Sequence, residues 1–365
     1  MTDLEAQPEP VQCPAGVATD PCVQLWPERL VPLGGIRAVP VSRTLPQRGL
    51  PTVGAWCFLD SFSSAEPTMS VLPHPHIGLQ TVTWPLKGTI RHRDSLGSEV
   101  LVRPGELNLM TAGRGVAHSE FSVIDETVID KTVVKTAEGQ VAMRGLQLWI
   151  ALPEQTRNGP AAFEQHTELP RFTLDGSQVT VLLGELAGHR SPATIYTPLL
   201  GAEIAHDGGR LSLPLRPTFE HALLVLDGVL TIDGTEVQPG PLAYLGAGRD
   251  RLEAIAAPGT RFLVIGGEPF AEELVMWWNF VARTHEEIEQ AREDWQESMS
   301  RGPGEPAQNA ARQRFPAVAG HDAGSGPQAG WIPAPPLPPL RLKPRRRTLL
   351  PEDRPEDLPE DPPKE

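Results

Sequence analysis

Two pairs of polar side chains, each at the spacing of a β-strand, bound the stretch of this chain from residue 73 to residue 120. His74 and His76 open the stretch, and His118 and Glu120 close it. The segments between the pairs are short, β-prone and separated by glycine-containing turns. Side chains two residues apart in a strand share a face, so each pair points one way. We therefore expect an antiparallel β fold in which facing strands bring the four side chains together.

These four side chains match the donor set of a metal site. Three imidazoles and one carboxylate suit Fe(II), Mn, Co, Ni or Zn, and six-coordination leaves positions for water, substrate or dioxygen. A lone histidine, such as His166 or His189, is instead read as an ordinary satisfied polar residue. Burying four polar groups together costs free energy unless a partner binds them. The paired spacing therefore predicts a metal site.

Longer motifs surround these residues at Val53–Asp60, Pro73–Val82, His92–Gly97, Arg103–Gly105, Met110–Glu120 and Gly145–Trp149. Together they resemble the pirin family of the cupin superfamily, and the similarity extends more loosely from about residue 29 to residue 299. In pirins, the positions matching His74, His76, His118 and Glu120 bind a single iron. The resemblance thus implies Fe(II), with Mn, Co, Ni, Cu or Zn as alternatives.

One position departs from the general cupin pattern, which places a ligand glutamate four residues after the second histidine. This chain has Gln80 there, and a neutral amide is a poor metal ligand. In pirins the carboxylate comes instead from the position matching Glu120. Because Gln80 has the strand parity of His76, we expect it to lie directly behind the ligands.

The second half of the chain repeats the turn pattern of the first. Residues 86–90 and 103–107 are echoed by residues 226–230 and 238–242, as expected of a duplicated unit. With 365 residues, 39% of them hydrophobic, the chain is long enough for two cores. We predict an all-β bicupin of two tandem antiparallel β-barrels of jelly-roll type, with a C-terminal helix and a disordered tail.

Domain boundaries follow from this repeat. The N-terminal cupin domain, which holds the metal, is placed at residues 29–152. The C-terminal cupin domain and its helix are placed at 153–300. Ligand positions transferred by offset into the second domain fall on Pro214, Arg216 and Glu253, and His221 nearby stands alone, so we expect no metal site there.

The predicted helix follows the second domain. Thr284 and Glu287 have the spacing of a capping box. An apolar stripe at helical spacing comes next, which predicts a helix packed on the barrels. The residues of the stripe are Ile288, Ala291, Trp295 and Met299.

Both ends of the chain are predicted to be disordered. Residues 1–28 hold four prolines before Trp26 and show no sustained period. Residues 301–365 hold 15 of the 40 prolines, with Phe315 and Trp331 as their aromatic residues. Such composition does not bury enough apolar surface for a core, so removing the tail should leave stability nearly unchanged.

Residues 121–144 form a longer link than the pirin resemblance implies. Their valine and threonine content, with Asp and Lys between, predicts an added hairpin. Such a hairpin either borders the mouth of the site or is exposed without a role.

Cysteine use and hydropathy point to the cytoplasm. There is no apolar run near 18 residues and no basic-then-apolar start, so neither a membrane span nor a signal peptide is expected. Cys13, Cys22 and Cys57 do not all pair and match no zinc pattern. Cys57 lies in an apolar strand and is expected in the core.

Charge argues against a nucleic-acid partner. The chain has 32 basic and 46 acidic side chains, of which the tail from residue 301 holds 10 and 9, so residues 1–300 carry a net charge of −15. Nucleic-acid binding needs a basic surface. The basic cluster at residues 341–347 is offset by the acidic residues after it.

Two functions from different classes follow from the resemblance. The first is an enzyme, a quercetin 2,3-dioxygenase-like oxidoreductase that acts on a small aromatic substrate and dioxygen, with Glu120 both holding the metal and exchanging a phenolic proton. The second is an iron-containing regulator whose redox state is read by an unidentified protein partner. A monomer is expected in either case. Open coordination positions favour the enzyme.

Overall fold

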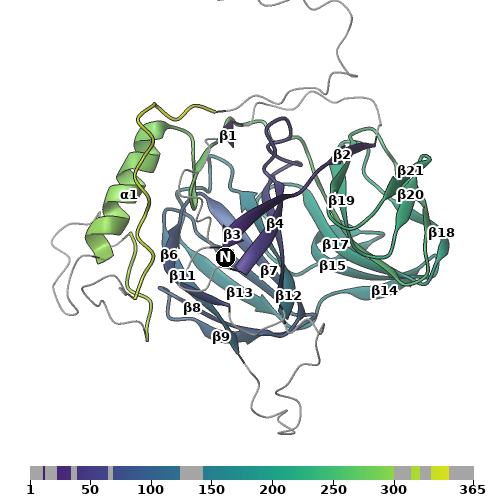
Figure 1. The fold of residues 1–365 in the computed structure, drawn as a ribbon, viewed down its shortest axis with the longest axis horizontal. Helices are drawn as coiled ribbons and strands as arrows, with labels where there is room; N and C mark the ends of the chain where they lie inside the picture. The colour runs from purple at the N-terminus through teal and green to yellow at the C-terminus, as the bar shows by residue number, and fades with distance from the viewer. Residues whose placement is uncertain are drawn as a thin grey trace, which may run out of the picture.

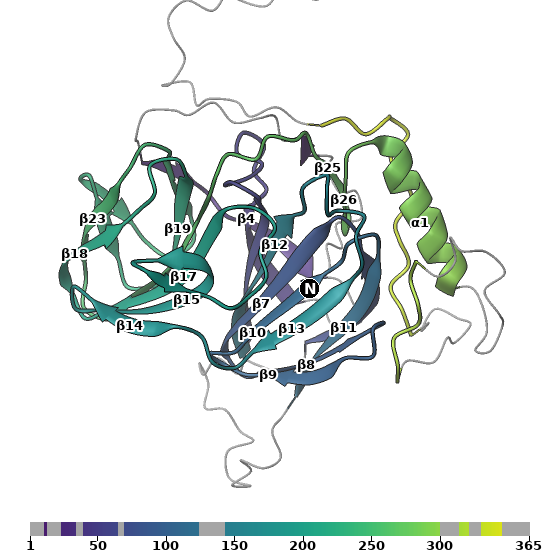
Figure 2. The same cartoon turned by 180° about the vertical axis from the view of Figure 1, so that it is seen from behind.

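The computed structural model describes residues 11–12, 23–33, 39–64, 69–123, 143–299, 314–320 and 330–344. Two β-sandwiches lie side by side, and a helix covers the side of the first sandwich that faces away from the second (Figures 1 and 2). Each sandwich pairs a large sheet with a four-stranded sheet. The predicted all-β bicupin fold is therefore confirmed, although the two sheets of each sandwich do not join into a closed barrel.

The first sandwich is built from strands that lie between residues 29 and 151, joined at one edge by a strand from further along the chain. Its larger sheet has the order β13 (Ala162–His166), β10 (Leu107–Thr111), β7 (Leu79–Lys87), β12 (Met143–Ala151), β5 (Trp56–Ser64), β4 (Val39–Leu45) and β3 (Arg29–Leu33). Its smaller sheet has the order β6 (Ser70–His76), β11 (Val116–Val123), β8 (Thr89–Asp94) and β9 (Glu99–Val102).

The second sandwich repeats this arrangement. Its larger sheet has the order β14 (Arg171–Leu174), β15 (Ser177–Leu186), β17 (Leu199–His206), β24 (Thr260–Gly267), β19 (Glu220–Asp227), β22 (Leu242–Gly246) and β2 (Gln24–Trp26), with β16 (His189–Arg190) paired to β15. Its smaller sheet has the order β18 (Gly209–Pro214), β23 (Arg251–Ala256), β20 (Leu230–Ile232) and β21 (Thr235–Val237). A third small sheet joins β1 (Val11–Gln12), β25 (Val275–Trp277) and β26 (Phe280–Ala282).

Each sandwich contains one strand from outside its own stretch of chain. The N-terminal strand β2 pairs with β22 of the second sandwich, and β13, which follows the first sandwich, pairs with β10 of that sandwich. Residues 24–26 are therefore ordered, contrary to the prediction for residues 1–28. A boundary at residue 152 also leaves β13 on the wrong side. An edge strand offers backbone donors and acceptors to any extended segment. A segment can therefore become ordered there without a hydrophobic periodicity of its own.

The central strands of the two large sheets, such as β12 and β24, are buried on both faces. On β24, Leu263 and Ile265 join the apolar cluster between the sandwiches, whereas Phe262 and Val264 face the interior of the second sandwich. The indole N–H of Trp56 contributes to the join by donating to the carbonyls of Leu200 and Gly266, both at 3.1 Å. The two sandwiches thus share one core.

Cys57 lies in this shared core and is fully buried, as predicted. Burial raises the pKa of its thiol to about 12, so the group is un-ionised at neutral pH. Cys13 and Cys22 lie outside the described residues, as do residues 124–142, where the hairpin is predicted.

The interiors of the two sandwiches differ in chemistry. In the first, His118 lies opposite His74 across the β11 and β6 ladder. In the second, Leu252 lies opposite Leu213 across the corresponding β23 and β18 ladder. Both leucines belong to a cluster of buried apolar side chains. The interior of the second sandwich is therefore an apolar core, whereas that of the first holds polar groups.

The positions transferred by offset are one residue out of register. Arg216 and Glu253 have side chains that are 51% and 66% exposed. Leu213 and Leu252, which precede Pro214 and Glu253, are buried. A shift of one residue in register moves a side chain to the other face of a strand. Counting residues from the turns was not accurate enough to exclude a shift of this size.

The predicted helix is present as α1, His285–Met299. Its first turn is capped as expected, because Glu287 N donates to Thr284 Oγ1 at 3.3 Å and Arg283 N donates to Glu287 Oε2 at 2.8 Å. Ile288 and Trp295 are fully buried. In the described part of the chain, no helix has the length and apolar character needed to cross a membrane.

Part of the tail is ordered, contrary to prediction. Residues 314–320 and 330–344, here called the tail strap, run beside α1 (Figure 1). Ile332 N donates to Pro73 O, and Trp295 Nε1 donates to Ile332 O, both at 2.8 Å. The proline-rich composition argues only against a core of the tail's own, and the apolar side of α1 supplies the missing partner surface. The strap side chains buried in this cluster are Phe315, Val318, Ile332, Ala334 and Leu342.

The ordered strap predicts that truncation destabilises the protein. Each fully buried Phe, Ile or Leu side chain stabilises the folded state by about 1.5–3 kcal/mol. The conformational entropy lost when the strap becomes ordered offsets part of this free energy. A net loss of about 2 kcal/mol lowers Tm by about 4–8 °C in a body of this size. We expect that fall, measured by differential scanning calorimetry, for a chain that ends at Gly302. A chain that ends at Pro344 is the control, and equal Tm values for the two chains would contradict the role of the strap.

Candidate metal centre

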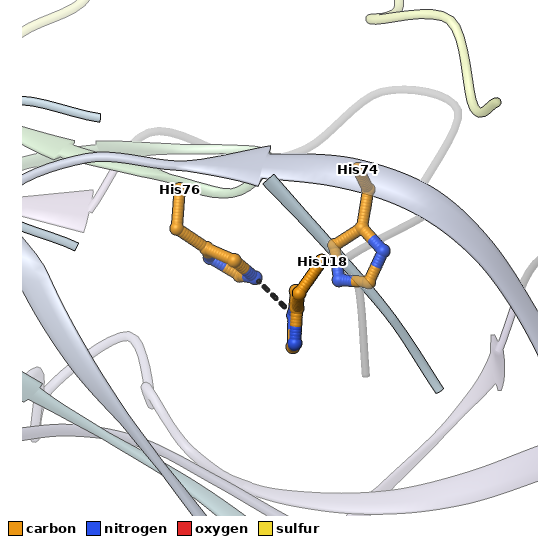
Figure 3. Close-up of side chains that lie close together, drawn as sticks. All are labelled: His74, His76 and His118. Carbon is orange, nitrogen blue, oxygen red and sulfur yellow. Dashed lines mark hydrogen bonds between the residues drawn. The ribbon is translucent and has the colours of Figure 1, made fainter. Parts of the chain in front are cut away.

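Three histidines converge in the interior of the first sandwich. His74 and His76 project from β6, and His118 projects from the neighbouring strand β11, directly opposite His74 (Figure 3). All three side chains are fully buried. The ladder changes register between His118 and Glu120, and Glu120 is also buried, at 1% exposure.

The three imidazoles are arranged to hold a cation. One ligand atom from each ring lies within 4.8 Å of the others, and His76 Nε2 is 3.1 Å from His118 Nε2. His74 Nδ1 lies 2.8 Å from Leu72 O, so this nitrogen carries the hydrogen and Nε2 carries the lone pair. His74 Nε2 is buried and has no hydrogen-bond partner. A buried acceptor without a partner is costly, and a metal ion would satisfy it.

Burial also sets the protonation of these rings. It lowers the pKa of His74, His76 and His118 well below the ordinary value, because a charged imidazolium is poorly solvated inside the sandwich. The three rings are therefore neutral at neutral pH. The neutral imidazole is the form that binds metals, so little proton competition opposes metal binding.

The fourth predicted ligand, Glu120, has a different set of neighbours. In the described part of the chain, the ligand atoms fall into two groups of three that share His118, and Glu120 groups with His92. Thr83 Oγ1 donates to Glu120 Oε1 at 3.1 Å, which holds this carboxylate beside β7. The structure thus brings Glu120 to the edge of the three-histidine cluster.

His92 is a member of the site that sequence reasoning missed. It projects from β8, where buried and half-buried residues alternate, and its side chain lies 3.4 Å from His118, Nδ1 to Nδ1. The available signal was the same strand spacing that identified the other ligands, because Asp94 follows His92 by two residues. The ring of His92 stacks on Phe163, with ring centroids 4.6 Å apart.

Gln80 does not lie behind the ligands, contrary to prediction. Its amide donates to Thr111 Oγ1 at 2.9 Å and to Thr194 O at 3.2 Å. Parity with His76 fails because the two residues lie on different strands and the intervening Gly78 has a φ of 68°, which interrupts the alternation. Thr83 takes the place predicted for Gln80.

The histidines predicted to be ordinary polar residues have other neighbours. His166 Nε2 lies 3.0 Å from Glu164 Oε2, and His189 stacks on Phe172. His221 is buried in the second sandwich. Among the described residues, none of the three belongs to a potential metal-binding group.

The interior beside the cluster combines aromatic rings with unpaired polar groups. Trp149 lies edge-on to His76, with ring centroids 5.2 Å apart. Asn108 lies opposite Thr83 in the β10 and β7 ladder, so both side chains face the interior. The indole nitrogen of Trp149 and both carboxamide atoms of Asn108 are buried without hydrogen-bond partners. These atoms are suited to bind a polar aromatic molecule.

Comparison with known proteins agrees with this architecture. The pirin family model matches residues 38–150, and the model of the pirin C-terminal cupin domain matches residues 203–300. A protein of Pseudomonas aeruginosa, named as a candidate quercetin 2,3-dioxygenase, is 45% identical over 278 residues, which cover 75% of this chain and 83% of that protein. Mouse pirin is 30% identical over 71% of this chain and 87% of its own.

A solved structure is also similar along most of the chain. The crystal structure of a quercetin 2,3-dioxygenase from Acinetobacter baumannii has a TM-score of 0.73 and 36% sequence identity, and the match covers 88% of this chain and 98% of that one. The two family models together match more than half of the sequence. The chain therefore belongs to the pirin family of the cupin superfamily.

Proposed function

We propose that this pirin is a metal-dependent dioxygenase that opens the ring of a flavonol or a similar aromatic diol, as quercetin 2,3-dioxygenases do. The observation that carries the proposal is the cluster of three neutral imidazoles, which lies beside aromatic side chains and unpaired polar groups. We assign one Fe(II) to His74, His76, His118 and Glu120, with Mn, Co, Ni, Cu or Zn as alternatives. The similar protein from Acinetobacter baumannii supports the reaction class.

The residues around the cluster have separable roles in this proposal. A bound Fe(II) would lower the pKa of a coordinated phenol and leave positions for dioxygen. Glu120 would accept the phenolic proton, and Thr83 would orient its carboxylate through the hydrogen bond described above. Trp149 offers an aromatic edge to the substrate ring, and Asn108 offers a donor and an acceptor for its hydroxyl groups.

A second function is favoured by one observation. His74, His76, His118 and Glu120 are at most 1% exposed in this structure. An enzyme needs access for its substrate, whereas a redox centre that is read by a protein partner does not. The alternative is therefore an iron-containing regulator in which the Fe(II)/Fe(III) state alters a surface of the protein.

We expect one metal ion per chain, bound in the first sandwich. Among the described residues of the second sandwich, no three side chains are grouped to hold a metal ion, and its interior is lined by apolar side chains. Elemental analysis of purified protein should give a ratio near one, and a double substitution, His74→Ala with His118→Ala, should abolish binding. His166→Ala with His189→Ala is the matched control and should keep its metal. Two ions per chain, or full metal retention in the first variant, would contradict the assignment.

Glu120 provides the test that separates the two functions. Glu120→Gln nearly preserves shape but removes the charge and the base, so aerobic flavonol consumption per bound metal should fall by about 10²- to 10⁴-fold. Glu253→Gln, an exposed position in the second sandwich, is the control. Undiminished turnover per metal would refute the role of Glu120. If the wild type consumes none of several flavonols with any of the metals, the regulator becomes the better description.

A further inference from the structure

Both ring nitrogens of His118 have an imidazole partner. Its Nε2 faces His76, and its Nδ1 lies 3.4 Å from His92 Nδ1. On the far side of His92, Nε2 lies 3.3 Å from Asp94 Oδ2. His118, His92 and Asp94 are all buried, at 2% exposure or less. A continuous line of polar contacts therefore runs from the metal-facing nitrogen of His118 to a buried carboxylate.

The hydrogens on this line have one consistent arrangement when both rings are neutral. A carboxylate only accepts hydrogen bonds, so His92 Nε2 carries the hydrogen and donates to Asp94. His92 Nδ1 then carries the lone pair and accepts from His118 Nδ1. The remaining nitrogen, His118 Nε2, is left with its lone pair directed at His76 Nε2, where the metal is assigned.

The carboxylate at the end of the line is fixed by the backbone. Asp94 Oδ1 accepts hydrogen bonds from Leu96 N and Ser98 N, both at 2.9 Å. Burial alone would raise the pKa of Asp94, but the hydrogen bonds from His92 and Ser98 bring it below its ordinary value. The stack on Phe163 holds the plane of His92. The positions of Asp94 and His92 are thus both fixed by neighbouring groups.

We propose that Asp94 and His92 are positioning residues, which set the tautomer of His118 and so present its Nε2 to the metal. The inference rests on the proposed assignment of His118 as a metal ligand. Outer groups that fix the tautomer of a ligand histidine typically change metal affinity by about 10- to 100-fold. Here the carboxylate of Asp94 does not contact the ligand histidine directly but acts on it through the imidazole of His92.

The substitution Asp94→Asn tests the proposal because it should reverse the direction of hydrogen-bond donation from His118 through His92 to residue 94. The amide oxygen is needed by Leu96 N and Ser98 N, which leaves the –NH₂ group facing His92 Nε2. His92 then has to donate from Nδ1, and His118 has to carry its hydrogen on Nε2. In metal-free protein labelled with ¹⁵N-histidine, two-bond correlation spectra should show His118 protonated at Nδ1 in the wild type and at Nε2 in the variant.

Metal binding gives the second readout. Ni(II) titrated into metal-free protein should bind Asp94→Asn about 10- to 100-fold more weakly than the wild type. Asp227→Asn alters a carboxylate of the second sandwich that pairs with Arg144 of β12; it is the control and should bind as the wild type does. Melting curves of each metal-free variant confirm that the fold is retained.

A third variant separates positioning from direct ligation by His92. His92→Phe keeps a ring to stack on Phe163 but forces no hydrogen onto His118 Nε2, so its loss of affinity should be smaller than that of Asp94→Asn. A larger loss would mean that His92 is itself a ligand and would overturn the proposal. So would wild-type affinity in Asp94→Asn, or an unchanged His118 tautomer in that variant. A wild type that binds no Ni(II) would instead refute the metal site, and the spectra would still decide the tautomer.

Discussion

The cost of placing polar groups inside a β-sandwich governs how this protein is built. The interior of the first sandwich is occupied by imidazole, carboxylate, amide and hydroxyl groups, and each of them needs a partner to offset its desolvation. That interior therefore contributes less apolar burial than the interior of the second sandwich, where Phe262 and Val264 occupy the inward positions of β24. On β12 of the first sandwich, inward positions are held instead by Gln147 and Trp149.

Apolar side chains also pack around the outside of the first sandwich. The outer face of its large sheet packs against the second sandwich. Trp56 connects the two sandwiches, because its indole N–H donates to the carbonyl of Leu200. Beyond the smaller sheet, α1 and the tail strap form a second apolar cluster that includes Ala117, the residue next to His118. The strap is hydrogen-bonded to Pro73, the residue next to His74. The elements that stabilise this sandwich are thus attached directly to the strands that carry the histidine cluster.

The parts of the site that followed from sequence are those encoded by local spacing. Period-two pairs identified His74, His76 and His118, because strand geometry alone decides which side chains share a face. The same rule failed at Gln80, where a glycine with positive φ breaks the strand, and at the offset positions of the second unit, where one residue of register inverts the face. Order in β2 and in the tail strap was not predictable from their composition, because it comes from partner surfaces far away in the sequence.

His118 is the residue on which the two halves of the site depend. It belongs to both groups of ligand atoms, one with His74 and His76 and the other with His92 and Glu120. A neutral imidazole has one ring nitrogen with a free lone pair and one that carries a hydrogen, so it binds a metal at one nitrogen only when the hydrogen is on the other. The neighbours of His118 Nδ1 therefore decide whether its Nε2 is free to bind a metal ion. In the proposal above His92 has this role, and its ring is itself held by Asp94, Phe163 and His118.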